Sequence, residues 1–279
     1  MKNPHQQAAR PGHWAPYHDV DTREQDPSVV ASVLSDLAGD GAALELGIGT
    51  GHVALPLAEW GTPVFGLDTS QEVISRLEER QEQTAEGCSP VQARIGDMAQ
   101  FALGTHYPLV YVIASAIFLL TNQKDQVSCF RSAAKHLTPR GRFVVEAAVP
   151  HVSGMASDRQ QMIVRELSEE HLKWSAFVHD PVHQVVRAQD VLVGPDGCRL
   201  TPRVMRYAYP AELDLMAQLA GLRLERRTAD WEGSPFTATS THHVSVYSHQ
   251  SAEENTSPPT GASACPSLDK LQHMCEELT

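Results

Sequence analysis

The sequence lacks the features of a secreted, membrane-spanning or metal-binding protein. Its 279 residues include five cysteines, none in a CxxC pair or a cluster with histidines. Their odd number and wide spacing suit reduced thiols. The longest apolar run, residues 111–120, is far too short to cross a bilayer, and the amino-terminal residues lack the apolar stretch of a secretory signal. We expect a cytoplasmic protein with no membrane association and no bound metal.

Excess basic charge is also missing. The chain has 34 acidic residues against 22 Lys and Arg, a formal net charge of −12, and no segment concentrates its basic residues. The phosphates of a nucleic acid would meet a repulsive field. We therefore expect no nucleic-acid partner, although a local basic groove would be compatible with this overall charge.

Short apolar strands alternate with amphipathic helices in the first half of the chain. Continuous apolar strands in this arrangement are typical of a parallel sheet covered by helices on both faces. We predict an α/β fold with a doubly wound sheet. The strands are expected at residues 42–46, 64–67, 91–95, 109–113 and 142–147, with helices near 29–37, 53–60 and 127–138.

The pattern changes after Pro150. From Glu169 to Tyr209, alternating strands are separated by the turn sequences HDP and GPDG, which predicts an inserted antiparallel β layer. A helix then begins at Pro210, and two last strands would complete the sheet. The expected layout is a flexible amino terminus at 1–22, one domain at 23–250 with the insert at 169–209, and a disordered tail at 251–279.

A glycine-rich turn, ELGIGTG, follows the first expected strand. Gly47, Gly49 and Gly51 allow a tight turn and close approach to a ligand. A nicotinamide or flavin site needs a further glycine where this chain has His52. Glu45 precedes the turn and would repel a pyrophosphate but attract an ammonium group. The ligand expected is a cationic amino acid joined to a nucleoside, which describes S-adenosylmethionine.

Carboxylates also follow the next two strands. Asp68 ends the second strand, where it can accept both hydroxyls of a ribose. Asp97 follows the third strand and can accept from an adenine amino group, while Met98 offers an apolar surface to the ring. A single carboxylate that follows a strand is more often a helix cap. Three carboxylates associated with three successive strands point to a nucleoside ligand.

With these motifs the sequence resembles the class I S-adenosylmethionine-dependent methyltransferases. ELGIGTG, LDTS at 67–70 and GDM at 96–98 match the family's motifs, and the resemblance runs from Tyr17 to Tyr247. It implies a seven-stranded, Rossmann-like sheet whose last strand is antiparallel. It further implies that Tyr17 lies on a lid over the cofactor and that Ala114 and Ser115 line its methionine moiety. Within the family, the chain is most similar to small-molecule methyltransferases of bacterial secondary metabolism, including amino-sugar N,N-dimethyltransferases.

The residues after the fourth strand bear on the acceptor. Methyltransferases that modify nucleobase amino groups carry an Asn or Asp, two prolines and an aromatic residue there, whereas this chain has ASAIF at 114–118. We therefore expect a small-molecule acceptor, methylated on nitrogen or carbon. Glu146, at the end of the fifth strand, could bind an amine, or could instead serve a backbone amide or an arginine. His151 could act as a base, or could simply be solvated.

Several alternatives stay open at this stage. His179 and Asp180 resemble a catalytic dyad, but the HDP sequence favours a turn. Tyr207 and Trp231 could line a pocket or belong to the core. The functional alternatives are a methyltransferase that modifies a nucleic acid or a protein, a nicotinamide-dependent oxidoreductase and a binding protein without activity. The oligomeric state is expected to be a monomer or a homodimer.

Overall fold

The computed structural model describes residues 26–82, 87–150, 160–195 and 197–250. Everything described below belongs to the compact unit that ends at His249. The expected lid residue Tyr17, the candidate base His151 and the expected tail lie outside the described residues. Among the residues that are described, no helix has the length and apolar character needed to span a membrane.

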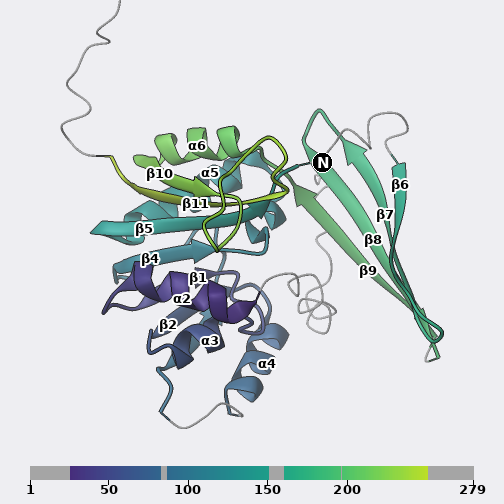
Figure 1. The fold of residues 1–279 in the computed structure, drawn as a ribbon, viewed down its shortest axis with the longest axis horizontal. Helices are drawn as coiled ribbons and strands as arrows, with labels where there is room; N and C mark the ends of the chain where they lie inside the picture. The colour runs from purple at the N-terminus through teal and green to yellow at the C-terminus, as the bar shows by residue number, and fades with distance from the viewer. Residues whose placement is uncertain (1–25, 83–86, 151–159, 196, 251–279) are drawn as a thin grey trace, which may run out of the picture. The chain divides into compact units, whose positions relative to one another are not determined.

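A seven-stranded sheet forms the centre of the fold, in the order β10-β11-β5-β4-β1-β2-β3 (Figure 1). The five strands from β5 to β3 are parallel, whereas β11 is antiparallel to both of its neighbours. This agrees with the predicted doubly wound sheet. The strands are β1 (Ala43–Leu46), β2 (Val64–Asp68), β3 (Val91–Ile95), β4 (Tyr107–Val112), β5 (Leu137–Ala148), β10 (Leu222–Thr228) and β11 (His242–His249).

Helices cover both faces of this sheet. The helix α2 shows how the sequence sets their ends: Asp26 caps it by accepting from the Ser28 amide, and Gly39 ends it with a φ of 57°. Apolar side chains of α2, α3 and α4 enter one core cluster, and those of α5 and α6 enter the other. The helices are α2 (Pro27–Ala38), α3 (Ala54–Glu59), α4 (Gln71–Gln81), α5 (Gln123–His136), α6 (Pro210–Leu219) and the 3-10 helix η2 (Ala116–Leu119).

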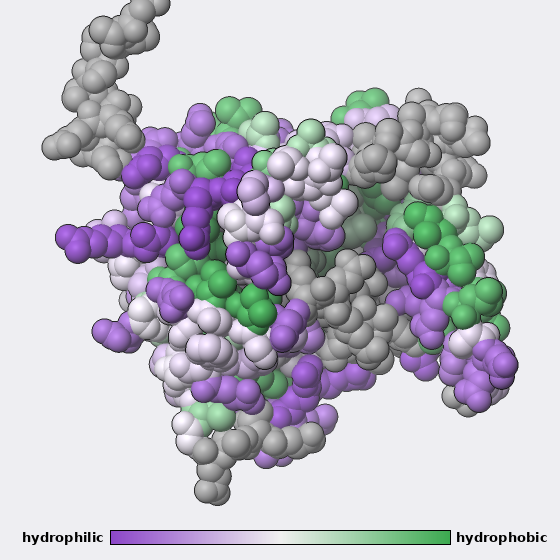
Figure 2. Space-filling model, viewed as in Figure 1, coloured by the Kyte–Doolittle hydropathy of each residue, from purple (hydrophilic) through white to green (hydrophobic). Residues whose placement is uncertain are grey.

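A second, four-stranded antiparallel sheet is inserted between β5 and α6. It consists of β6 (Gln160–Leu167), β7 (Leu172–Asp180), β8 (Val185–Gly194) and β9 (Gly197–Arg206). The buried guanidinium of Arg206 anchors it, donating to Gln126 on α5 and to Glu212 on α6. Hydrophobic surface gathers over β6 (Figure 2).

Two predicted boundaries were wrong. The inserted layer begins at Gln160 rather than Glu169, because a β-bulge between Val164 and Glu166 interrupts the alternation of apolar and polar residues in β6. The strand β5 begins at Leu137 rather than Arg142. The sequence Pro139-Arg140-Gly141, which directly follows the helix predicted near 127–138, lies inside this strand.

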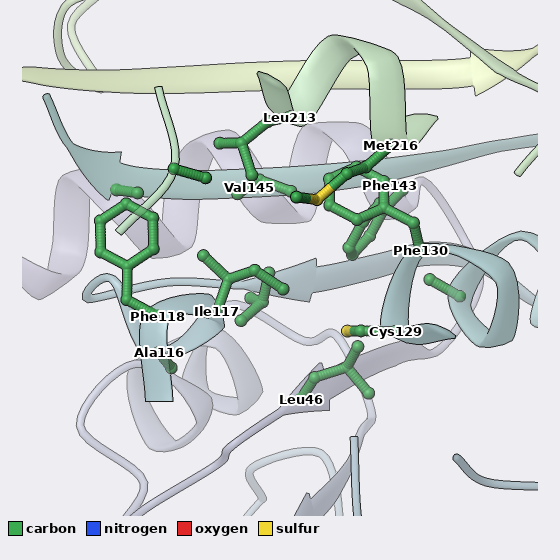
Figure 3. Close-up of a cluster of buried hydrophobic side chains, with 14 of the residues drawn as sticks. Leu46, Ala116, Ile117, Phe118, Cys129, Phe130, Phe143, Val145, Leu213 and Met216 are labelled. Atoms are coloured by element: carbon green, nitrogen blue, oxygen red, sulfur yellow. The ribbon is translucent and has the colours of Figure 1, made fainter. Parts of the chain in front are cut away.

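The core under α5 and α6 is built around aromatic rings (Figure 3). The ring of Phe130 meets those of Phe143 and Tyr247 edge-on, at centroid separations of 5.1 and 5.7 Å. Ala116, Ile117 and other side chains of η2 extend this cluster toward the inserted sheet, where Phe177 and Val186 join it. The same core therefore supports both sheets.

Candidate functional site

The glycine-rich turn follows β1 directly, and several of its backbone amides donate to carbonyl groups of the protein itself. The amides of Gly47 and Ile48 both donate to the carbonyl of Leu67, at 2.8 and 3.0 Å, and the amide of Gly51 donates to the carbonyl of Ile48 at 3.1 Å. A pyrophosphate-binding turn needs such amides directed at the ligand. The geometry therefore argues against a dinucleotide.

The glycines are required by conformation and space. Gly47, Gly49 and Gly51 all have positive φ angles, between 58° and 79°. A Cβ atom at Gly51 would lie 2.2 Å from a methyl carbon of Leu77 on α4. The turn can therefore approach α4 closely only without a side chain at Gly51, and the positive φ angles favour glycine at all three positions.

Asp68 ends β2 and is held in a fixed orientation beside this turn. Its Oδ2 accepts from the Gly49 amide at 3.1 Å, and its Oδ1 accepts from the Ser70 amide at 2.9 Å. Each carboxylate oxygen has two lone pairs, so each retains the capacity for another donor. A pair of ribose hydroxyls fits this arrangement.

Glu45 lies one residue before the end of β1 and is only 3% exposed. The Tyr111 hydroxyl donates to its Oε2 at 2.9 Å. Burial raises the pKa of Glu45 to about 8; the Tyr111 hydrogen bond opposes this shift, and the nearby charge of Asp68 adds to it. A cation brought to this carboxyl group would favour its ionised form.

Asp97 follows β3 and lies next to the Asp68 backbone, because the Gly96 amide donates to the Asp68 carbonyl at 2.9 Å. The Asp97 Oδ1 accepts from the Ala99 amide at 2.8 Å. Met98 is half-buried against the core cluster under α5. The three carboxylates Glu45, Asp68 and Asp97 thus belong to three adjacent strands, as predicted. Glu45 lies deeper than expected, within the sheet.

Ala114 and Ser115 follow β4 with positive φ angles of 52° and 57°, a backbone conformation that residues other than glycine seldom adopt. Glu146 holds them in place. Its Oε2 accepts from the Ala114 amide at 2.5 Å and its carbonyl accepts from the Ser115 amide at 3.3 Å. The Ser115 hydroxyl in turn accepts from the Ala148 amide at 2.9 Å. Such a conformation costs about 1–3 kcal/mol per residue and persists where its surroundings impose it.

Glu146 therefore has a backbone partner, one of the two alternatives that the sequence left open. Its side chain is 5% exposed, and burial raises its pKa to about 7 despite the hydrogen bond from Ala114. The sequence does not reveal the left-handed segment, since neither Ala114 nor Ser115 is a residue that favours this conformation.

The remaining candidates are mostly structural. Asp180 accepts from the amides of Val182 and His183 and contacts the His183 ring at 2.8 Å, so the HDP sequence forms the predicted turn. His179 bonds instead to the buried Tyr207 hydroxyl at 2.9 Å. The side chains of His179 and Asp180 are therefore engaged with different partners and do not act as a dyad.

A cavity of about 450 Å³ lies between the start of α2 and the segment that joins β10 to β11. His242 lines it and pairs with Ala148 in the sheet register, while Glu146 pairs with Val244. Partners across antiparallel strands share a face, so Glu146 lies on the face of the sheet that borders this cavity. Its lining also includes Asp26, Asp230, Trp231 and Glu232. The three carboxylates make the cavity favourable for a cationic or amine-bearing ligand.

Comparisons with known proteins identify methyltransferases as relatives of this chain. A family model described as a methyltransferase domain matches residues 43–141. The CcbJ methyltransferase of Streptomyces caelestis is 37% identical, with a TM-score of 0.76 over 81% of this chain and 90% of that chain. The cypemycin N-terminal methyltransferase of a Streptomyces species is 26% identical over 80% of this chain and 89% of its own length.

A third relative supports the fold. CalS10, an amino pentose methyltransferase from Micromonospora echinaspora solved with bound S-adenosylmethionine, is 19% identical, with a TM-score of 0.61 over 84% of this chain and 95% of that chain. The likeness to the 37% identical CcbJ methyltransferase excludes the nicotinamide alternative, and the amides of the glycine turn that donate to protein acceptors agree with this. The chain belongs to the S-adenosylmethionine-dependent methyltransferase family, and S-adenosylmethionine is its cofactor.

Proposed function

We propose that this enzyme transfers the methyl group of S-adenosylmethionine to a nitrogen of a small, amine-bearing molecule, an intermediate of bacterial natural-product synthesis. The observation that carries the proposal is the site after β1 to β3, where the turn amides are used internally and three carboxylates are available. Such a site suits a nucleoside that carries a cationic amino acid. A cytoplasmic location is part of the proposal, because five widely spaced cysteines suit a reducing compartment.

Each candidate side chain has a role in this proposal. Asp68 accepts the ribose hydroxyls, and Glu45 attracts the cofactor's ammonium group. Asp97 accepts from the adenine amino group and Met98 packs against the ring. Gly47 and Gly49 allow the turn to approach the cofactor, and Ala114 and Ser115 line its methionine moiety. Tyr17 would cover the cofactor, and His151 would serve as a base near the acceptor.

The bound cofactor supplies a methyl group on a positively charged sulfur, so the reaction is a displacement that needs an aligned nucleophile. The main contribution of the protein is then orientation, which can lower a barrier by up to about 7–11 kcal/mol. Glu146 contributes by fixing Ala114 and Ser115. Its negative charge would also stabilise the positive charge that develops on an acceptor nitrogen.

A nitrogen acceptor is favoured over carbon by two observations. The cypemycin relative is an N-terminal methyltransferase by name. The cavity beside β11 is lined by three carboxylates, which would attract an amine. The net charge of −12 disfavours a nucleic acid as the acceptor.

The proposal is tested by measuring S-adenosylhomocysteine formation with a panel of small amines, electron-rich aromatic carbon compounds, RNA and protein extracts. We expect turnover with one class of amine. Turnover with RNA or protein alone, or none above background with every acceptor, would refute it.

The variant Glu146→Gln tests the site within the same assay. We expect kcat to fall by about 10- to 100-fold, because the variant loses the carboxylate charge and weakens a charge-assisted hydrogen bond. Cofactor affinity should change less than threefold. The exposed Glu59→Gln is the matched control. If cofactor affinity fell and kcat did not, Glu146 would belong to cofactor binding instead.

A further inference from the structure

Gln126 on α5 is a fully buried side-chain amide whose two donor hydrogens are both used. Its Nε2 donates to the carbonyl of Ile117 at 3.2 Å and to the carbonyl of Arg206 at 2.8 Å. Its Oε1 accepts from the Arg206 guanidinium at 2.5 Å. The opposite orientation of the amide would place a donor against the guanidinium and an acceptor against two carbonyls. The partners therefore hold this side chain in one position.

On one side, Gln126 holds the segment that follows β4. Ile117 belongs to η2, which begins directly after Ser115. The Phe118 amide donates to the Ser115 carbonyl at 2.9 Å, which bonds η2 to the left-handed pair Ala114 and Ser115. The side chain of Ile117 is buried in the core (Figure 3). A restriction of Ala114 and Ser115 is therefore passed on to the Ile117 carbonyl.

On the other side, Gln126 holds the end of the inserted sheet. Arg206 is the last residue of β9. Its guanidinium also donates to Gln184, in the turn between β7 and β8, at 2.8 Å and to Glu212 on α6 at 2.6 Å. The amide of the next residue, Tyr207, donates to the Gln184 carbonyl at 3.0 Å. The end of β9 and the turn between β7 and β8 thus form one bonded unit, and Gln126 joins this unit to η2.

The attachment of the inserted sheet does not depend on Gln126 alone. The ion pair of Arg206 with Glu212 ties β9 to α6, and the hydrogen bond from Gln123 to Glu212 at 2.8 Å ties α5 to the same carboxylate. Neither of these two contacts involves η2. A buried amide adds little net stability even when it is fully bonded. The particular contribution of Gln126 is therefore the link between the inserted sheet and the segment after β4.

We infer that Gln126 is a positioning residue that couples cofactor binding to the inserted sheet. The inference rests on the proposed function, in which Ala114 and Ser115 line the methionine moiety of the cofactor. A bound cofactor restricts the motion of these two residues and of η2, and Gln126 extends this restriction to the end of β9. Binding that rigidifies one part of a protein can prepare another part for a second ligand without a change of fold. An acceptor has to reach the methyl group beside this segment, so a fixed neighbour of η2 helps to align it.

Hydrogen exchange of the full chain, with and without S-adenosylhomocysteine, tests the inference in the absence of an acceptor. In the natural chain we expect the ligand to slow exchange by at least about threefold, both at residues 114–120 and at residues 203–209. The ionised carboxylate of Gln126→Glu still accepts from Arg206 but cannot donate to the two carbonyls. In this variant the slowing at 114–120 should persist and the slowing at 203–209 should be lost. The affinity for the ligand, measured by calorimetry, should change by less than about threefold.

The matched control is Gln123→Glu, three residues earlier on α5. This exposed side chain donates to Glu212, so the same substitution breaks a hydrogen bond of the same network without contact to η2. The slowing at 203–209 should remain in this variant. A purely structural role of Gln126 would speed exchange in the free protein but would leave the change caused by the ligand unaltered.

Loss of the slowing at 203–209 in Gln126→Glu, together with its retention in Gln123→Glu, supports the inference. A natural chain in which the ligand slows exchange only at 114–120 overturns it, as does a Gln126→Glu variant that keeps both effects. Binding without any slowing at 114–120 overturns it too, since Ala114 and Ser115 would then not contact the cofactor. Should Gln126→Glu fail to fold, Gln126→Met takes its place with the same expectation. Because no acceptor is present, a failure of the proposed amine substrate is seen separately, in the turnover assay.

Discussion

Replacing Glu45 by glutamine should remove most of the pH dependence of cofactor binding between pH 6 and 7.5. In the free protein, burial raises the pKa of Glu45 to about 8. The cofactor's ammonium group should favour the ionised carboxylate, so binding releases a proton whenever the pH lies below that value. The affinity of the natural enzyme should therefore rise with pH. The glutamine side chain of the variant cannot ionise, yet its oxygen can still accept from the Tyr111 hydroxyl.

The size of the effect follows from the pKa. If only the ionised form binds, the apparent dissociation constant is multiplied by one plus the ratio of protonated to ionised Glu45. With a pKa of about 8, this factor is roughly 100 at pH 6 and roughly 4 at pH 7.5, a change of about 20- to 25-fold. Above pH 7.5 the cofactor's own amino group begins to lose its proton, since α-amino groups titrate near 8, so the range from 6 to 7.5 is the informative one.

Isothermal titration calorimetry can measure both quantities. Affinities are compared at pH 6.0, 6.5, 7.0 and 7.5, and titrations in buffers of different ionisation enthalpy count the released protons. Glu146, with a pKa of about 7, also titrates in this range. The contribution of Glu45 is therefore the part of the affinity change with pH that is present in the natural enzyme and absent in Glu45→Gln. An affinity of the natural enzyme that stays constant across this range, or the same slope in Glu45→Gln, would refute the reasoning.

Two further predictions concern fixed contacts. Asp68→Ala should weaken cofactor binding by about 10- to 100-fold in calorimetry, since it removes the proposed ribose acceptor and the partner of the Gly49 amide. The exposed Asp40→Ala is its control and should leave the affinity unchanged. Equal affinities for both variants would exclude Asp68 from the site. Arg206→Ala should lower the free energy of unfolding in urea by about 3–5 kcal/mol, because it breaks the buried contacts with Gln126 and Glu212. Arg142→Ala is its control, since the pair of Arg142 with Glu225 is exposed to solvent and should contribute less than about 1 kcal/mol. A loss in Arg206→Ala no larger than in Arg142→Ala would contradict the assigned role of Arg206.

Local patterns were sufficient to predict the parallel sheet. Its strands are short apolar runs with charged helices between them, and neither feature depends on distant parts of the chain. The glycines of the turn were equally informative, because their positive φ angles are a local requirement. The inserted layer was predicted from its turns, but its first strand was missed, since the bulge after Val164 breaks the alternation by which a strand is recognised.

The sequence by itself determined the sheet, the glycine turn and the presence of carboxylates after successive strands, because each is encoded in a few neighbouring residues. Only the tertiary structure decided what surrounds those groups. It buried Glu45 against Tyr111, which changes its ionisation, and placed Glu146 under a strained segment 32 residues earlier in the chain. It also aligned the inserted strands so that Met162, Val164 and Leu200, which come from two different strands, share one face. These properties arise from contacts between residues far apart in the chain, and the pattern of neighbouring residues does not specify such contacts.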